Sequence, residues 1–129
     1  MLEDYVAVDL EMTGLRAKVD RILEIGAVRV KRGNTVISFG QIINPRMKIP
    51  KEITELTGIT DEMAEKGCEI QKAMEEFRQF ADGLPLIGHN ILFDYSFLKQ
   101  YMVNQGIPFE KDGIDTLKLA RKFLPEAEK

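Results

Sequence analysis

The stretch that decides the fold is residues 5–11, YVAVDLE, in which an apolar run ends in two acids, Asp9 and Glu11. A run that is nearly continuous in apolar residues is typical of a central strand. Alternate residues of a strand point the same way, so the two carboxylates are expected on one face. Like charges so placed repel each other, and burial strengthens the repulsion unless a cation lies between them. Hard divalent cations such as Mg²⁺ or Mn²⁺, which prefer oxygen ligands, would relieve it.

Composition places the chain among single-domain globular proteins. Its 129 residues are 44% hydrophobic and 30% charged, which is enough for one core. The formal net charge of −3 argues against a broad basic surface for nucleic acid, although bound cations would reverse the field at an acidic site. The lone Cys68 cannot form an internal disulfide. No apolar stretch approaches the roughly 20 residues that span a bilayer, and residues 1–4 do not resemble a signal peptide. We therefore expect a cytoplasmic protein without a membrane partner.

Outward from the first strand, the sequence predicts a mixed α/β fold. Further strands are expected over residues 22–30, 36–43 and 84–88, the first two joined as a hairpin by the turn pair Gly33-Asn34. Helices are expected over residues 51–56, from 61 onward with Thr60 as the cap, and over 70–81, about 90–105 and 115–124. A hairpin unit followed by β–α repeats suits a ribonuclease H-like mixed sheet flanked by helices, although several α/β folds share that order.

A second acidic signal lies far along the chain. Residues 88–94 read GHNILFD, and Asp94 falls in the first turn of its predicted helix. Phe97, Leu98 and Tyr101 follow three, four and seven residues later, so Asp94 shares their core-facing side, where an unpaired carboxylate is unfavourable. A metal ion or its bound water would compensate this charge. The alternative is a helix-start Asp bonded to backbone amides.

Residues 12–15, MTGL, come directly after the first acidic pair. Thr13 offers a hydroxyl, and Gly14 lets the backbone or sugar of a ligand approach closely. The alternative is a simple turn. Basic residues that follow this stretch and the third strand are candidates for phosphate contacts, with exposed, solvent-facing side chains as the alternative: Arg16, Lys18, Arg21, Arg46, Lys48 and Lys51.

The two acidic stretches resemble motifs of a known family. Residues 9–15, DLEMTGL, resemble the first motif of the DEDD 3′–5′ exonucleases, and residues 88–94 resemble the second. Four stretches between and after the motifs resemble the family as well: residues 24–27, 44–45, 56–60 and 115–117. The resemblance therefore covers almost the whole chain. Within the superfamily the chain is most similar to the proofreading exonucleases of bacterial DNA polymerase III. Its first motif is also similar to that of oligoribonucleases, so RNA stays an alternative substrate.

The resemblance implies hydrolysis of phosphodiester bonds at single-stranded or frayed 3′ ends of DNA, with release of nucleoside monophosphates. It implies two Mg²⁺ or Mn²⁺ ions, with Asp9 bridging both, Glu11 on the ion that activates water and Asp94 supporting the other. It also implies a set of residues around the terminal nucleotide: Leu10, Met12, Thr13, Gly14, His89, Asn90 and Phe93. His89 and Asn90 are expected to be structural or substrate-side rather than catalytic, and a core role is the alternative for Phe93. The implied protein partners are a polymerase subunit or a second copy of the chain.

The sequence departs from the family at the third motif, a His or Tyr followed by an Asp. The chain has a single His, His89, which already belongs to the second motif. No general base is therefore expected within residues 1–129, and loss of such a base typically lowers the rate about 10²- to 10⁴-fold. We expect one exonuclease domain over residues 1–129, C-terminally truncated, without the family's C-terminal helical segment, and weak or inactive unless a longer chain or another copy completes it. A catalytically degenerate nucleic-acid- or partner-binding module of the same fold is the alternative.

Overall fold

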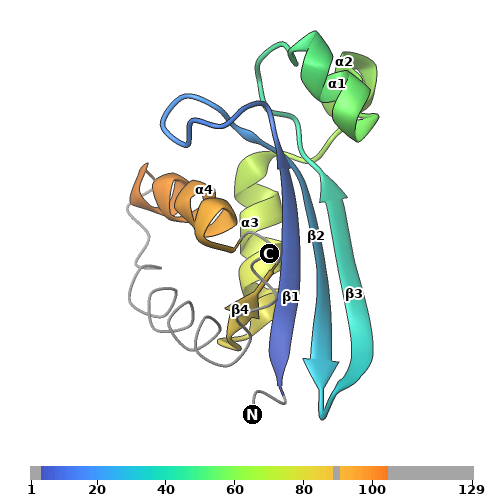
Figure 1. Cartoon of the computed structure of the whole chain (residues 1–129), viewed down its shortest axis with the longest axis vertical. Helices are drawn as coiled ribbons and strands as arrows, with labels where there is room; N and C mark the ends of the chain where they lie inside the picture. The colour runs from blue at the N-terminus through green and yellow to red at the C-terminus, as the bar shows by residue number, and fades with distance from the viewer. Residues whose placement is uncertain (1–3, 89–90, 105–129) are drawn as a thin grey trace.

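A computed structural model describes residues 4–88 and 91–104, which form a four-stranded sheet packed against helices (Figure 1). The strands are β1 (Tyr5–Met12), β2 (Ile22–Lys31), β3 (Asn34–Ile42) and β4 (Leu86–Ile87). The helices are α1 (Lys51–Thr57), α2 (Asp61–Glu65), α3 (Ile70–Ala81) and α4 (Ile91–Asn104). The sheet order is β3-β2-β1-β4, and β1 pairs antiparallel with β2 but parallel with β4. The mixed sheet predicted from the sequence is confirmed.

The main core lies on one face of this sheet. Alternate residues of β1 are buried on that face: Val6, Val8, Leu10 and Met12. The register of β2 extends the apolar surface, because Ala27 lies opposite Val8 and Ile25 lies opposite Leu10. Helix α3, behind the sheet in Figure 1, covers this surface with residues at helical spacing: Ala73, Met74, Phe77 and Ala81. The other face of β1 is thereby left to its polar residues.

Helix α4 lies beside β1, next to the short strand β4 (Figure 1). Its Phe97 and Leu98 are buried in the main core, and Asp94, one helical turn earlier, is only 4% exposed. The prediction that Asp94 shares the core-facing side of its helix is confirmed. Helices α1 and α2 are held by a smaller core of their own, formed by Leu23, Ile49, Ile59 and Ala64.

The hairpin between β2 and β3 turns one residue earlier than predicted. Lys31 pairs with Asn34, so the two turn residues are Arg32 and Gly33, with φ of 52° and 78°. Two-residue hairpin turns that match the twist of the strands need positive φ at both positions. Gly33 meets this requirement at the second position without strain, and Asn34 begins β3 instead of closing the turn.

Other elements agree with the sequence apart from their ends. Thr60 caps α2 as predicted, because its hydroxyl accepts a hydrogen bond from the Met63 amide at 3.1 Å. Strand β4 is shorter than the predicted 84–88, and α4 begins and ends one residue inside the predicted range. The helix predicted over 115–124 lies outside the described residues. No helix within residues 4–88 and 91–104 has the length and apolar character needed to cross a membrane.

Candidate active site

Two acids project from β1 on the face opposite the core. Asp9 is exposed and Glu11 is half-buried, whereas their strand neighbours are buried, so the predicted common face is confirmed. Gly26 of β2 lies opposite Asp9, and because it carries no side chain it leaves room beside this carboxylate. Glu24 lies opposite Glu11 and brings a third acid to the same face. Sequence reasoning did not assign Glu24 to the site, since its position depends on the register between β1 and β2.

Asp94 joins this group from α4 through the free edge of β1. Strand β4 pairs with β1 only at Val6 and Ala7, where the Val6 amide donates to the Pro85 carbonyl at 2.9 Å. The Leu10 amide, four residues further along, points to the same edge, because amide directions alternate along a strand. Asp94 accepts a hydrogen bond from this amide. This amide belongs to the acidic strand and not to the first turn of α4, so it is a third kind of partner beside the two predicted alternatives, and the metal contact of Asp94 stays a prediction.

The carboxylates perturb one another. Burial, followed by the charge of Asp9 and then of Glu11, raises the pKa of Asp94 to about 7, while the hydrogen bond from the Leu10 amide acts in the opposite direction. Burial also raises the pKa of Glu11, and the charges of Asp9 and Glu24 add to this effect. The site therefore concentrates negative charge that a cation would compensate.

The donor set suits a divalent metal ion in its chemistry, because carboxylate oxygens are the ligands that Mg²⁺ and Mn²⁺ prefer. Across residues 4–88 and 91–104, however, no group of three or more His, Cys, Asp or Glu side chains is gathered closely enough to hold an ion. The acids are thus electrostatically coupled without forming a closed coordination shell. Their assignment as metal ligands stays a prediction.

The residues predicted around the terminal nucleotide are mostly buried. Leu10, Met12 and Thr13 are 4%, 8% and 1% exposed, so a nucleotide would meet their backbone rather than their side chains. Phe93 is half-buried and packs edge-on against Phe97, with ring centroids 5.3 Å apart, which favours its core role. His89 and Asn90 lie outside the described residues.

The structure gives Gly14 a reason to be glycine that was not predicted, while the predicted approach of a ligand stays a prediction. A Cβ atom at this position would lie 2.4 Å from Oδ2 of Asp20, closer than any side chain tolerates. The Thr13 hydroxyl is likewise engaged within the chain, because it donates to Asp20 and accepts from the Arg21 amide. Thr13 and Gly14 therefore open a structured loop, residues 13–21, rather than a simple turn.

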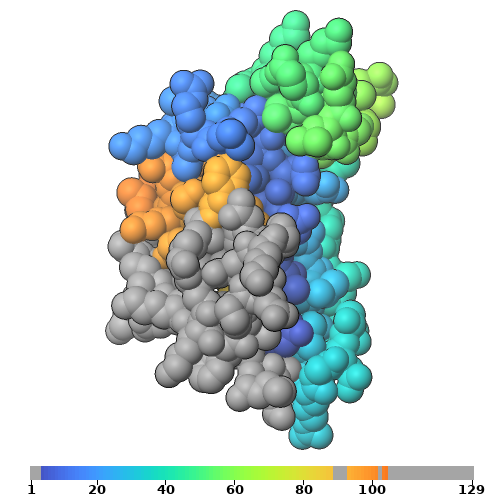
Figure 2. All heavy atoms as spheres, in the orientation of Figure 1, coloured from blue at the N-terminus to red at the C-terminus, as the bar shows by residue number. Residues whose placement is uncertain are grey.

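Three of the six basic candidates make contacts within the chain, since the Arg16 guanidinium lies 3.9 Å from the Asp20 carboxylate. The Arg21 guanidinium donates to the Pro45 carbonyl at 3.0 Å, and Arg46 forms an ion pair with Glu69 at 2.5 Å. Arg16 and Lys18 are exposed on the 13–21 loop, which lies at the surface above α4 in Figure 2, and Lys48 and Lys51 are exposed as well. Phosphate contacts by the six basic residues stay a prediction.

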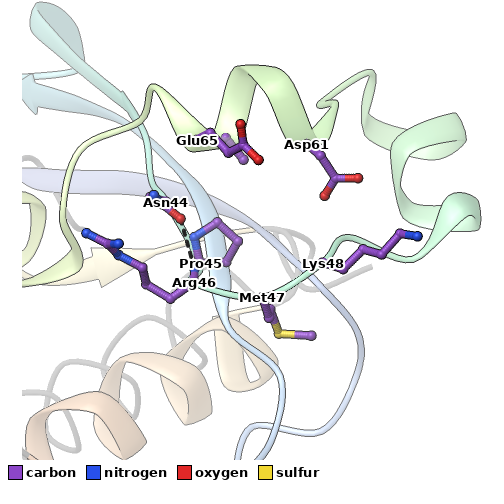
Figure 3. A pocket seen from close by; sticks show the side chains of 8 residues that line it. Asn44, Pro45, Arg46, Met47, Lys48, Asp61 and Glu65 are labelled. Carbon is purple, nitrogen blue, oxygen red and sulfur yellow. Dashed lines mark hydrogen bonds between the residues drawn. The ribbon is translucent and has the colours of Figure 1, made fainter.

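A separate hollow of about 490 Å³ lies between α2 and the loop formed by residues 44–48 (Figure 3). The Asn44 side chain accepts a hydrogen bond from the Arg46 amide at 2.9 Å, which supports the left-handed conformation of Arg46 at φ 56°. Asp61 points from α2 toward the loop in Figure 3, and its carboxylate accepts from the Ile49 amide at 2.9 Å. The hollow shares no lining residue with the acidic site, so we assign it no part in the chemistry.

Comparison with known proteins identifies the family. Residues 6–129 match the family described as Exonuclease. The chain belongs to the exonuclease family. This exonuclease chain is 38% identical over 127 residues to the DNA polymerase III PolC-type of Clostridium perfringens, and 39% identical over 121 residues to that of Thermotoga maritima. The matches cover 98% and 93% of the chain but only 9% of each polymerase, so the chain spans a small part of these relatives.

Solved structures confirm the ribonuclease H-like fold of this family member. Escherichia coli exonuclease I, solved with a dA13 oligonucleotide, superposes with a TM-score of 0.73 at 16% identity over 96% of this chain and 31% of its own. Exonuclease I from Methylocaldum szegediense superposes with a TM-score of 0.72 at 22% identity over 98% of this chain and 31% of its own. Identities this low support the shared fold alone. The resemblance to proofreading exonucleases of DNA polymerase III, predicted from the motifs, is confirmed by the polymerase relatives.

Proposed function

We propose that this chain is a 3′–5′ exonuclease domain that removes nucleoside monophosphates from the 3′ end of DNA with two divalent ions. The observation that carries the proposal is the arrangement of three acids on β1 and α4: Asp9 and Glu11 share one face of β1, and their charges act on the buried Asp94. Membership of the exonuclease family supports it. DNA is the proposed substrate because the relatives are named DNA polymerases and the solved exonuclease I holds a DNA oligonucleotide.

The proposed roles follow from how each side chain is held. Asp9, Glu11 and Asp94 would hold the ions, which, when bound, supply an activated water and stabilise charge on the attacking and leaving oxygens. The Leu10 amide interacts with the Asp94 carboxylate and favours its charged form, which is the form that would bind an ion. Because the pKa of Asp94 lies near neutrality, ion binding at neutral pH would displace a proton from it. The exposed Asp9 leaves one side of the group open to a substrate.

Turnover by these 129 residues alone is proposed to be slow. The single imidazole of the chain belongs to His89, and the general base of the family's third motif has no counterpart in the sequence. The expected deficit is about 10²- to 10⁴-fold, the usual contribution of a positioned base. Hydroxide replaces a missing base in part, so we expect the rate to rise with pH above neutrality.

A degradation assay tests the proposal. A 5′-labelled single strand of about 20 nucleotides, long enough to cover the site sizes of such proteins, is incubated with Mn²⁺ and the chain. We expect a ladder that shortens from the 3′ end, lost in Asp9→Asn and retained in Glu75→Gln, an exposed acid on α3 used as the matched control. Equal rates for wild type and Asp9→Asn, or internal cuts, would contradict the proposal.

The same assay addresses the alternatives. An RNA strand of identical sequence that is degraded faster than the DNA would make the assignment of DNA wrong. Binding of the strand by wild type without any turnover, even at raised pH, would favour a degenerate binding module of the same fold.

A further inference from the structure

The loop between β1 and β2, residues 13–21, is closed at its base by two hydrogen bonds between the same pair of residues. The Thr13 amide donates to the Arg21 carbonyl at 2.8 Å, and the Arg21 amide donates to the Thr13 hydroxyl at 2.9 Å. Within the loop, the amides of Val19 and Asp20 both donate to the Arg16 carbonyl, at 3.0 and 2.7 Å. Figure 1 shows this loop at the end of β1, above α4. Because β1 runs directly into it, the loop begins two residues after Glu11.

Asp20 lies inside this closed loop. Its side chain is only 12% exposed, and its two oxygens have different partners. Oδ1 accepts from the Thr13 hydroxyl at 3.1 Å, and Oδ2 accepts from the Arg16 amide at 3.0 Å. The Arg16 guanidinium is 80% exposed and 3.9 Å away, so its attraction is screened by water. The Thr13 hydroxyl also lies 3.4 Å from the Met47 sulfur, but its single proton belongs with the stronger acceptor, the carboxylate.

The Asp20 carboxylate also fills the space beside Gly14. A Cβ at Gly14 would lie 2.4 Å from Oδ2 and 2.7 Å from Oδ1, so a side chain at position 14 and this carboxylate exclude each other. Among the apolar residues of the loop, Ala17 packs against the main core, whereas Leu15 and Val19 are 80% and 54% exposed. The segment around Gly14 and Leu15 is therefore held mainly by the hydrogen bonds of the Asp20 side chain.

We propose that Asp20 is a positioning residue of the exonuclease site. By holding the loop closed, it fixes the backbone of Thr13 and Gly14, which continues the acidic strand beyond Glu11, next to the acids where the proposed function expects the 3′-terminal nucleotide. Asp20 itself touches neither substrate nor metal ion. The inference rests on the proposed function, because it takes the end of β1 as the binding place of that nucleotide.

Kinetics on single-stranded DNA with Mn²⁺ separate positioning from general structural damage. For Asp20→Ala we expect KM to rise about tenfold, the usual effect of losing hydrogen bonds to a charged group, with kcat within about threefold of wild type. Glu75→Gln serves as the reference variant for Mn²⁺ affinity and for melting temperature. The Mn²⁺ affinity of Asp20→Ala should equal that of the reference. Asp20→Asn, which keeps one acceptor oxygen, should restore KM in part. An unchanged KM in an active Asp20→Ala variant would overturn the inference, as would a parallel loss of Mn²⁺ binding.

A double-mutant cycle tests the contact between Gly14 and Asp20 without relying on turnover. Gly14→Ala alone should lower the melting temperature, because the new methyl group displaces the carboxylate. In the Asp20→Ala background the same substitution should have little further effect, since the space is empty. Independent effects of the two substitutions would overturn the inference. A wild-type chain without exonuclease activity would count against the proposed function, whereas the cycle on melting temperature would still test the role given to Asp20.

Discussion

Replacing Asp94 by Asn should stabilise the metal-free protein above neutral pH. The folded chain holds the Asp94 proton more tightly than the unfolded chain, because burial and the neighbouring acids raise its pKa to about 7 from the ordinary 3.8. The contribution of Asp94 to the free energy of unfolding is therefore most favourable below the ordinary pKa, and it is lost as the pH rises toward about 7. Asparagine removes the charge, yet it keeps an oxygen that accepts the hydrogen bond of the Leu10 amide.

The magnitude follows from the same shift. At about 1.4 kcal/mol per pH unit, the difference between the two pKa values corresponds to about 4 kcal/mol. Solvent reaches the site beside the exposed Asp9, and screening reduces the expected gain to about 2 kcal/mol. For a domain of this size, that gain raises the melting temperature on the order of 5–10 °C.

Thermal melting with a chelator, followed by circular dichroism, measures this effect. The advantage of Asp94→Asn should be largest near pH 8 and should fall to roughly half near pH 5.5, as the wild-type carboxyl becomes protonated in the folded state. Glu75→Gln, which removes an exposed acid on α3, should show no such pH dependence. An Asp94→Asn variant that melts below wild type at pH about 8 would refute the reasoning, because it would make the charged carboxylate a net stabiliser.

Three further substitutions test the fold. Phe77→Ala should lower the free energy of unfolding by about 3–5 kcal/mol, because this side chain is fully buried under the sheet. Gln79→Ala, on the exposed side of α3, should be nearly neutral, and urea unfolding measures both variants. Thr60→Ala should lower it by about 1 kcal/mol through loss of the α2 cap, and an Asp in its place should retain the stability. Gly67→Ala should destabilise the fold by about 1–3 kcal/mol, because the new Cβ would lie 2.8 Å from a backbone carbonyl of β3. In the control Gly40→Ala the new Cβ meets nothing within 4 Å, so the stability should not change. Thermal melting of both variants checks this, and equal effects would contradict it.

Local periodicity was sufficient to predict much of the site and its scaffold. The alternation of period two placed Asp9 and Glu11 on one face of β1, and the structure has them there. The 3.6-residue period predicted α3 over residues 70–81 and put Asp94 on the core side of α4. In each case the signal lies within one element, where sequence spacing and geometry are directly related.

The contacts that were not predicted depend on strand register, on where a strand ends or on the conformation of a loop. Glu24 reaches Glu11 only through the register of two strands, which no local pattern specifies. The Leu10 amide lies beyond the part of β1 that pairs with β4, because β4 stops early. The length of β4 was overestimated from its apolar residues. The side chain next to Gly14 comes from Asp20, six residues later in a folded loop, and the loop conformation that brings it there has no signal in the sequence. These are consequences of tertiary pairing rather than of propensity.

Titration calorimetry with Mn²⁺ in the absence of DNA tests most directly whether the acids of β1 and α4 form one metal site. Wild type should bind Mn²⁺ near pH 7 with release of protons, seen as a dependence of the binding enthalpy on the buffer, because Asp94 is partly protonated there. Asp9→Asn should weaken this binding at least about tenfold, in the range found when ligand-shell groups of metal sites are replaced. Equal Mn²⁺ affinity in wild type and Asp9→Asn, or no binding by either, would contradict a shared metal site at these carboxylates.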